Sequence, residues 1–251
     1  MPSSDANRNF GGSGGPWFAT THWSVVLSAA DAAAPGAQEA LEKLCRVYWH
    51  PLYSYVRLLG HNAEDAQDLT QAFFARFLEK NIVQLARQER GKFRSFLLTS
   101  LKNFLANEWE RARTSKRGGQ HVHLSWDQTS AENQFEREHS SGSSPEEIFD
   151  RRWALALFQQ ALTRLRQEYA SAGKGEQFEQ LKGFLSDAPE DGGYAQVATC
   201  LGLTPSSVAV AVHRLRRRYG EVVREEIAHT VANREDIQDE LRYLIELVSR
   251  S

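Results

Sequence analysis

The chain of 251 residues contains only two cysteines, Cys45 and Cys200, which lie far apart in the sequence. A disulfide-stapled fold is therefore excluded, no cysteine pair has metal-ligand spacing, and a reducing cytoplasm is the expected location. No apolar run approaches the roughly 18 residues that a membrane helix needs, so no membrane partner is expected. The first ten residues lack a basic start followed by an apolar stretch, which predicts no secretory signal.

Alternation of apolar and polar residues, the pattern of a half-buried strand, is absent over any useful length. Apolar residues instead recur at steps of three and four in segments such as 41–59, 93–109 and 153–169. With 41% hydrophobic and 10% aromatic residues, the chain can build packed cores and is not a disordered polypeptide. The sequence therefore predicts an all-α protein.

Charges of both signs are present, but they are segregated along the chain, which the net charge of −2 conceals. Residues 82–118 hold nine basic and three acidic residues, a net charge of +6, whereas residues 119–150 hold one basic and seven acidic residues, a net charge of −6. Four more arginines crowd five positions near the end of the chain: Arg214, Arg216, Arg217 and Arg218. Two basic islands suggest two contacts with a polyanion, and solvated helix faces are the alternative.

The strongest local signal is the segment 194–208, which reads YAQVATCLGLTPSSV. A short helix is expected to end at Gly202, which can adopt the positive φ of a tight turn, and Thr204 and Pro205 suit the N-cap and first position of a second helix. This pattern is typical of a helix-turn-helix, although a helical hairpin with a basic tail is the alternative. Residues 208, 212, 215 and 219 would pack inward. The opposite stripe, which would face the major groove, consists of Ser206, Ser207, Val210, His213, Arg214 and Arg217.

Two further segments precede this motif. Residues 63–74 read AEDAQDLTQAFF, an acidic start followed by aromatics, and residues 93–103 read FRSFLLTSLKN, running on to Arg111-Ala112-Arg113. In their order and spacing, the three segments resemble region two and region four of bacterial RNA polymerase sigma factors of the extracytoplasmic-function group, in the sigma-seventy superfamily. The resemblance covers roughly residues 40–117 and 148–225. It implies two helical domains joined by a flexible linker.

The same resemblance sets the expected domain boundaries. They are a flexible N-terminal tail at 1–19, a region-two domain at 20–117, an acidic flexible linker at 118–147, a region-four domain at 148–230 and a C-terminal helical extension at 231–251. The Thr-Thr-His-Trp-Ser start at 20–24 and the Asp-Glu-Leu-Arg tail at 239–242 resemble a subgroup with extensions at both ends.

A sigma factor binds core RNA polymerase and promoter DNA, and the resemblance implies residues for each contact. An exposed acidic edge would dock on the clamp helices of the β′ subunit: Glu64, Asp65, Asp68 and Gln71. The minus-ten element would be contacted by Lys102, Asn103, Trp109, Arg111, Arg113, Lys116 and Arg117. Because Trp109 also continues the apolar ladder of its helix, we expect it chiefly in the core. The minus-thirty-five element would be read by the stripe of the helix-turn-helix.

Thr70 and the pair His121 and His123 are the candidates for regulation and for metal binding. A phosphate on Thr70, beside the acidic edge, would add about −1.5 to −2 charges to a surface meant for a basic partner, so a protein kinase is considered as a partner. An anti-sigma factor is the other regulatory partner considered. His121 and His123 lack accompanying ligands, and no cofactor, metal site or catalytic group is expected.

Two other functions remain as alternatives. A helix-turn-helix regulator that acts without polymerase would leave the basic, aromatic segment 93–117 unexplained. A helical nucleic-acid-processing enzyme, such as a recombinase or nuclease, would need a carboxylate cluster or a nucleophile that the sequence does not display. The sequence therefore predicts a non-enzymatic factor that initiates transcription at specific promoters.

Overall fold

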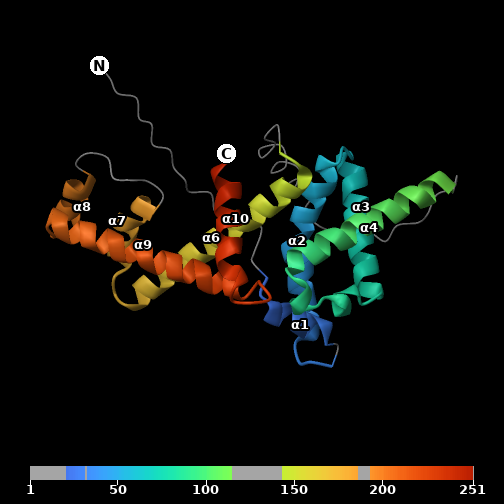
Figure 1. Ribbon diagram of the computed structural model, residues 1–251, viewed down its shortest axis with the longest axis horizontal. Coiled ribbons are helices and arrows are strands. Elements are labelled where there is room, and N and C mark those ends of the chain that lie inside the picture. Colours follow the sequence, from blue (N-terminus) through green and yellow to red (C-terminus); the bar gives the residue numbers. More distant parts are fainter. Residues whose placement is uncertain (1–20, 32, 115–142, 186–192, 251) are drawn as a thin grey trace, which may run out of the picture.

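The computed structural model describes residues 21–31, 33–114, 143–185 and 193–250, and every regular element in these ranges is a helix (Figure 1). This confirms the predicted all-α class. The α-helices are α1 (Trp23–Ala30), α2 (Ala37–Leu58), α3 (Ala63–Glu79), α4 (Phe93–Thr114), α6 (Pro145–Ser171), α7 (Gly175–Leu181), α8 (Gly193–Leu201), α9 (Pro205–Ala228) and α10 (Asp236–Ser249). The 3-10 helices are η1 (Ile82–Leu85), η2 (Gln88–Arg90) and η3 (Lys182–Leu185). No single helix in the described ranges has the length and apolar character needed to span a membrane.

Helix α6 begins earlier than its apolar ladder. Ser144 is the N-cap: its Oγ accepts from the backbone N–H of Glu147 at 3.2 Å, and the Glu147 carboxylate accepts from the backbone N–H of Ser144 at 2.9 Å. This reciprocal capping box satisfies two backbone donors that a helix start leaves open. The predicted linker covers residues 118–147, and its part up to residue 142 lies outside the described residues. Helix α6 includes the last three residues of that predicted linker, 145–147.

The larger hydrophobic core lies among α1 to α4 and is completed by elements from the other half of the chain. Phe73 of α3 and Leu101 of α4 belong to one continuous cluster with Trp153 of α6, Ile227 of α9 and Leu244 of α10. All five are at most 1% exposed. The C-terminal half is therefore packed against the N-terminal helices through a shared hydrophobic core.

A second, smaller core stabilises the opposite end of the molecule. It joins Leu165 of α6, Phe178 of α7, Ala198 of α8, and Val208 and Leu215 of α9. Figure 1 shows α6 and α9 running side by side from this end to the larger core. Both of these long helices contribute residues to both cores, so they connect the two ends of the molecule.

The side chain of Arg94 lies inside the protein, with only 2% exposed. Its Nε donates to Asp150 Oδ1 at 3.1 Å, and its Nη2 donates to Glu240 Oε1 at 2.6 Å. Its guanidinium carbon lies 3.9 Å from the ring centroid of Trp153, a cation–π contact. Counting Arg94 in a basic island that meets a polyanion is therefore wrong, because its charge joins α4 to α6 and α10.

A second polar network joins the start of α1 to the end of α9. His22 Nε2 lies 2.9 Å from Glu226 Oε2, and the same carboxylate accepts from Gln160 at 3.0 Å and from Arg164 at 3.2 Å. The Glu226 side chain is 4% exposed. The His22 ring also stacks on His229, with centroids 4.5 Å apart. A buried carboxylate with three polar partners thus holds α1, α6 and α9 together.

Replacing Glu226 with glutamine is expected to lower the free energy of unfolding by about 1–2 kcal/mol at neutral pH and to flatten its decline in acid. Hydrogen bonds with His22, and then Arg164, hold the pKa of Glu226 below its usual range. A carboxyl with a depressed folded-state pKa adds stability above its unfolded pKa of about 4.3, and this stability is lost as pH falls through the folded value.

Urea unfolding at about pH 7, 4.5 and 3 checks this expectation. Glu246→Gln is the control, because Glu246 is an exposed acid on α10. Parallel losses of stability in the wild type and in Glu226→Gln across this pH range would contradict the role of the Glu226 carboxylate.

Candidate nucleic-acid interface

Helices α8 and α9 have the arrangement that the sequence predicts for a helix-turn-helix. The two helices meet at 97° across a three-residue break, close to the geometry of known helix-turn-helix pairs. Gly202 has φ 64°, the left-handed conformation that glycine adopts without strain. Thr204 caps α9 by accepting from the backbone N–H of Ser207 at 3.2 Å, and Pro205 follows at the start of the helix. These local predictions are confirmed.

The two faces of α9 separate as predicted. Val208, Val212 and Leu215 are at most 2% exposed and pack in the smaller core. The predicted reading stripe is exposed at all six positions: Ser206, Ser207, Val210, His213, Arg214 and Arg217. The structure therefore leaves these side chains accessible from solvent on the face opposite the core.

The four arginines at positions 214–218 differ in their surroundings. Arg218 makes a bidentate pair with Glu168, with N–O distances of 2.8 and 2.9 Å, and it also donates to Glu221 and Glu225. The hydrogen bonds to Glu168 are the main reason why the pKa of Arg218 is raised. Arg216 donates to the Phe184 carbonyl at 2.7 Å. Arg218 therefore joins α9 to α6.

The acidic edge is exposed at its start but not along its whole length. Glu64 and Asp65 are exposed and Asp68 is half-buried. Asn62 caps α3 by accepting from the backbone N–H of Asp65 at 2.8 Å. Gln71 is only 4% exposed, so its predicted exposure is wrong. It lies between α2 and α4, lining pockets on both sides of α3, which leaves little of it in solvent.

Thr70 is fully buried, and its hydroxyl donates to the Ala66 carbonyl at 2.7 Å. A kinase could reach this hydroxyl only after α3 unfolds locally. The hypothesis of phosphorylation at Thr70 therefore has no support in the folded structure.

The predicted minus-ten residues of α4 whose side chains are described are all exposed. Lys102 and Asn103 are exposed, and Lys102 Nζ lies 2.5 Å from Glu146 Oε1. Arg111 is exposed and pairs with Glu108 at 2.8 Å. The helix includes Arg113 up to its end at Thr114, but the Arg113 side chain and residues 116 and 117 (Lys116 and Arg117) are outside the described part of the chain.

Trp109 is 63% exposed, so its predicted place in the core is wrong. The apolar ladder begins at Phe93 and advances by four residues at a time. Each such step overshoots a full turn by about 40°, so four steps carry the side chain about 160° around the helix. Trp109 therefore lies nearly opposite the buried Phe93, on the exposed side of α4.

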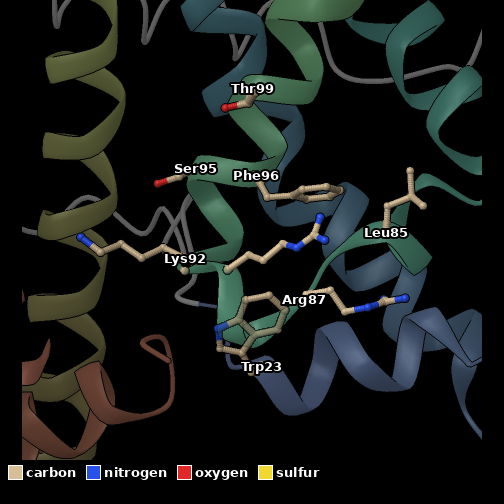
Figure 2. Close-up of a pocket in the computed structure, with 9 residues that line it drawn as sticks. Trp23, Leu85, Arg87, Lys92, Ser95, Phe96 and Thr99 are labelled. Carbon is tan, nitrogen blue, oxygen red and sulfur yellow. The ribbon is translucent and has the colours of Figure 1, made fainter. Parts of the chain in front are cut away.

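A basic pocket of about 610 Å³ lies beside the start of α4. Figure 2 shows Trp23, Arg87, Lys92 and Phe96 around it, with Ser95 and Thr99 following one another along α4. The remaining lining residues are Leu85, Arg90 and Gly91. The pocket thus combines three cationic side chains with two aromatic rings and two hydroxyls, the groups that bind phosphate and stack on bases.

Sequence reasoning missed this pocket. Its three basic residues were counted in the positive segment, but nothing in the local pattern distinguished them from other surface charges. Trp23 comes from α1, more than sixty residues before the rest, and only the packing of α1 against η1 and α4 brings it there. Its indole nitrogen is buried, with no hydrogen-bond partner among the described residues.

Residues 44–114 match the protein family described as Sigma-70 region 2. Comparison with curated proteins and with solved structures found no match. The matched segment runs from α2 to the end of α4 and contains the acidic edge, most of the basic pocket and the exposed half of α4. The match supports the chain as a member of the sigma-70 family and, with it, a sigma-factor role in transcription initiation.

Proposed function

We propose that the chain is a sigma factor of the extracytoplasmic-function group that binds core RNA polymerase and directs it to promoters with two separate surfaces. The observation that carries this proposal is the presence, in one chain, of a Sigma-70 region 2 segment and a helix-turn-helix with an exposed reading stripe. In this proposal residues 20–117 act as region two and residues 148–230 as region four. The protein would work in the cytoplasm, where core polymerase and promoter DNA are found.

Region two would hold the unpaired strand of the minus-ten element. The pocket beside α4 supplies positive charge from Arg87, Arg90 and Lys92 and aromatic surface from Phe96, while Trp23, only 3% exposed, lies at its floor. Stacking of a base on an aromatic ring contributes about 1–3 kcal/mol. The pocket is large enough for a base, and the exposed Trp109 further along α4 offers a second stacking surface.

Region four would read duplex DNA at the minus-thirty-five element. The exposed His213 and Arg214 can donate to base edges in the major groove, and Val210 can contact a thymine methyl group. Arg217, at the end of the stripe, would contact phosphate. Core polymerase would dock on the acidic edge through Glu64, Asp65 and Asp68, whose carboxylates suit a basic partner surface.

The direct experiment is run-off transcription from candidate promoters with purified core polymerase, with and without the chain. The proposal predicts transcripts that start at defined positions only when the chain is present. If the protein binds duplex DNA but supports no initiation with core polymerase, the proposal fails, and a helix-turn-helix regulator that acts alone remains.

Replacing both Arg214 and Arg217 with alanine is expected to lower promoter-specific transcription about tenfold or more, because a base contact and a phosphate contact are lost. Affinity for core polymerase should not change. The matched control replaces Arg166 and Arg234, two exposed arginines outside the stripe, with alanine. Equal activity of the two double variants in run-off assays would show that this stripe does not read DNA.

A further inference from the structure

A pocket of about 590 Å³ lies between the first half of α2 and the second half of α3. Its apolar wall consists of five side chains: Leu41, Cys45, Trp49, Phe74 and Leu78. Steps of four residues place positions 41, 45 and 49 on one face of α2, and positions 74 and 78 on one face of α3. We call this site the α2–α3 pocket. Its volume lies within the range of small-molecule sites, about 300 to 1,000 Å³.

The wall of the α2–α3 pocket is apolar and uncharged. Trp49 and Phe74 are 5% and 4% exposed and lie deepest, whereas Leu41, Cys45 and Leu78 are half-buried. Burial is the main reason why the pKa of Cys45 is raised to about 11, and the charge of Glu42 raises it further. The thiol is therefore uncharged at neutral pH, so it behaves as a small apolar group of the wall and not as a nucleophile.

The rim of the α2–α3 pocket holds one available cation. Glu42 accepts from the side chain of Gln38 at 3.3 Å, so a neighbour already contacts its carboxylate. Arg46 is exposed, and its guanidinium has no ion pair or hydrogen bond within the part of the chain that the structure describes. A guanidinium is a planar fork of N–H donors that matches the two oxygens of a carboxylate. An apolar pocket beside such a group suits a molecule with an apolar body and one negative charge.

We propose that the α2–α3 pocket binds a small amphipathic carboxylate, with its apolar body against Trp49 and Phe74 and its carboxylate on Arg46. A neutral molecule of the same length would gain no charge-assisted hydrogen bond, and an amine would meet Arg46 with a like charge. Because Phe74 and Leu78 belong to α3, the bound molecule would contact the helix that carries the acidic edge. This binding requires neither polymerase nor DNA, so it is tested separately from the proposed function.

The test uses the full chain and the fluorescent probe 1-anilinonaphthalene-8-sulfonate, which has an aromatic body and one negative charge. Decanoate, decanol and decylamine, all below the concentration at which they form micelles, compete for the probe site. Decanoate should bind about tenfold more tightly than decanol, because a hydrogen bond to a charged group contributes at least this factor. Decylamine should bind more weakly than decanoate.

Substitutions at the rim test the role of the guanidinium. Arg46→Ala should weaken decanoate binding about tenfold and leave decanol binding unchanged, and Arg46→Lys should retain most of the preference for decanoate. Lys43→Ala is the matched control, because Lys43 is an exposed cation of α2 that does not line the pocket. Circular dichroism verifies that each variant is folded.

The two cysteines locate the binding site. Alkylation by iodoacetamide, followed by peptide mapping, should show that decanoate slows the reaction of Cys45 severalfold and leaves the exposed Cys200 unaffected. Cys45→Phe, which places a ring inside the pocket, should abolish displacement of the probe by decanoate. If this variant does not fold, Arg46→Ala and the protection of Cys45 decide.

Three outcomes would overturn the proposal. They are equal affinity of decanoate for Arg46→Ala and Lys43→Ala, equal alkylation of Cys45 with and without decanoate, and probe binding that weakens as the chain concentration rises. The last result would assign the α2–α3 pocket to a second copy of the chain. Run-off transcription keeps the two hypotheses apart, because decanoate binding by a chain that supports no initiation would reject only the sigma-factor function.

Discussion

Replacing Arg94 with alanine is expected to lower the free energy of unfolding by about 3–5 kcal/mol, the range for removing one partner of a buried ion pair. Arg94 is the most deeply buried cation of the contact between α4, α6 and α10, and Glu240 beside it is 1% exposed. Without Arg94, the carboxylate keeps only Lys92, which lies at the edge of the contact. The face of Trp153 also loses the guanidinium stacked on it. Urea unfolding at neutral pH measures the loss.

Lys92→Ala provides the matched control, since Lys92 pairs with the same carboxylate but is 32% exposed. Its loss should not exceed about 1 kcal/mol, because water can replace the ammonium group. If Arg94→Ala costs as little as Lys92→Ala, then Arg94 is solvated in solution and the C-terminal half is not packed against α4 as the structure has it.

Reversing two charges on the acidic edge, Glu64→Lys together with Asp68→Lys, is expected to weaken binding to core polymerase about a hundredfold. Two attractive contacts become repulsive ones, and like charges facing each other across an interface cost several kcal/mol. The fold should survive, because Glu64 is exposed and Asp68 half-buried, and each contributes only about 0.3–1 kcal/mol through the helix dipole. Titration of fluorescently labelled chain with core polymerase at low salt measures the affinity.

A double variant with the same change in net charge controls for nonspecific electrostatics: Glu176→Lys with Glu235→Lys. Both positions are exposed and neither belongs to α3. This control should bind core polymerase nearly as the wild type does. A similar loss of affinity in both double variants would mean that overall charge, and not the acidic edge, determines docking.

The features that were predicted correctly depend on residues close together in the sequence. Gly202, Thr204 and Pro205 determine the turn and the start of α9 within four positions, and the 3.6-residue period separates the buried from the exposed face of that helix. Asn62 caps α3 in the same local way. Such signals act before tertiary packing, so a single sequence is enough to identify them.

The features that were missed depend on distant partners. Arg94 is buried because Asp150 and Glu240 approach it from 56 and 146 positions away, and without them the same residue would be a surface charge. Gln71 is enclosed because α3 has neighbours on both sides, which no pattern within α3 reveals. The pocket beside α4 depends likewise on Trp23, whose position is set by the packing of α1.

The continuity of α9 has a consequence for how the exposed stripe is oriented relative to the larger core. One end of the helix carries Arg214 and Arg217, and the other end is anchored by Val222 and Ile227, with no break between them. Inserting one residue between these ends would rotate them by about 100° relative to each other and separate them by about 1.5 Å more. The rotation of one end of α9 relative to the other about the helix axis is therefore fixed by the number of residues between them. Only an insertion of about seven residues, which completes two turns, would restore the relative orientation of the two ends.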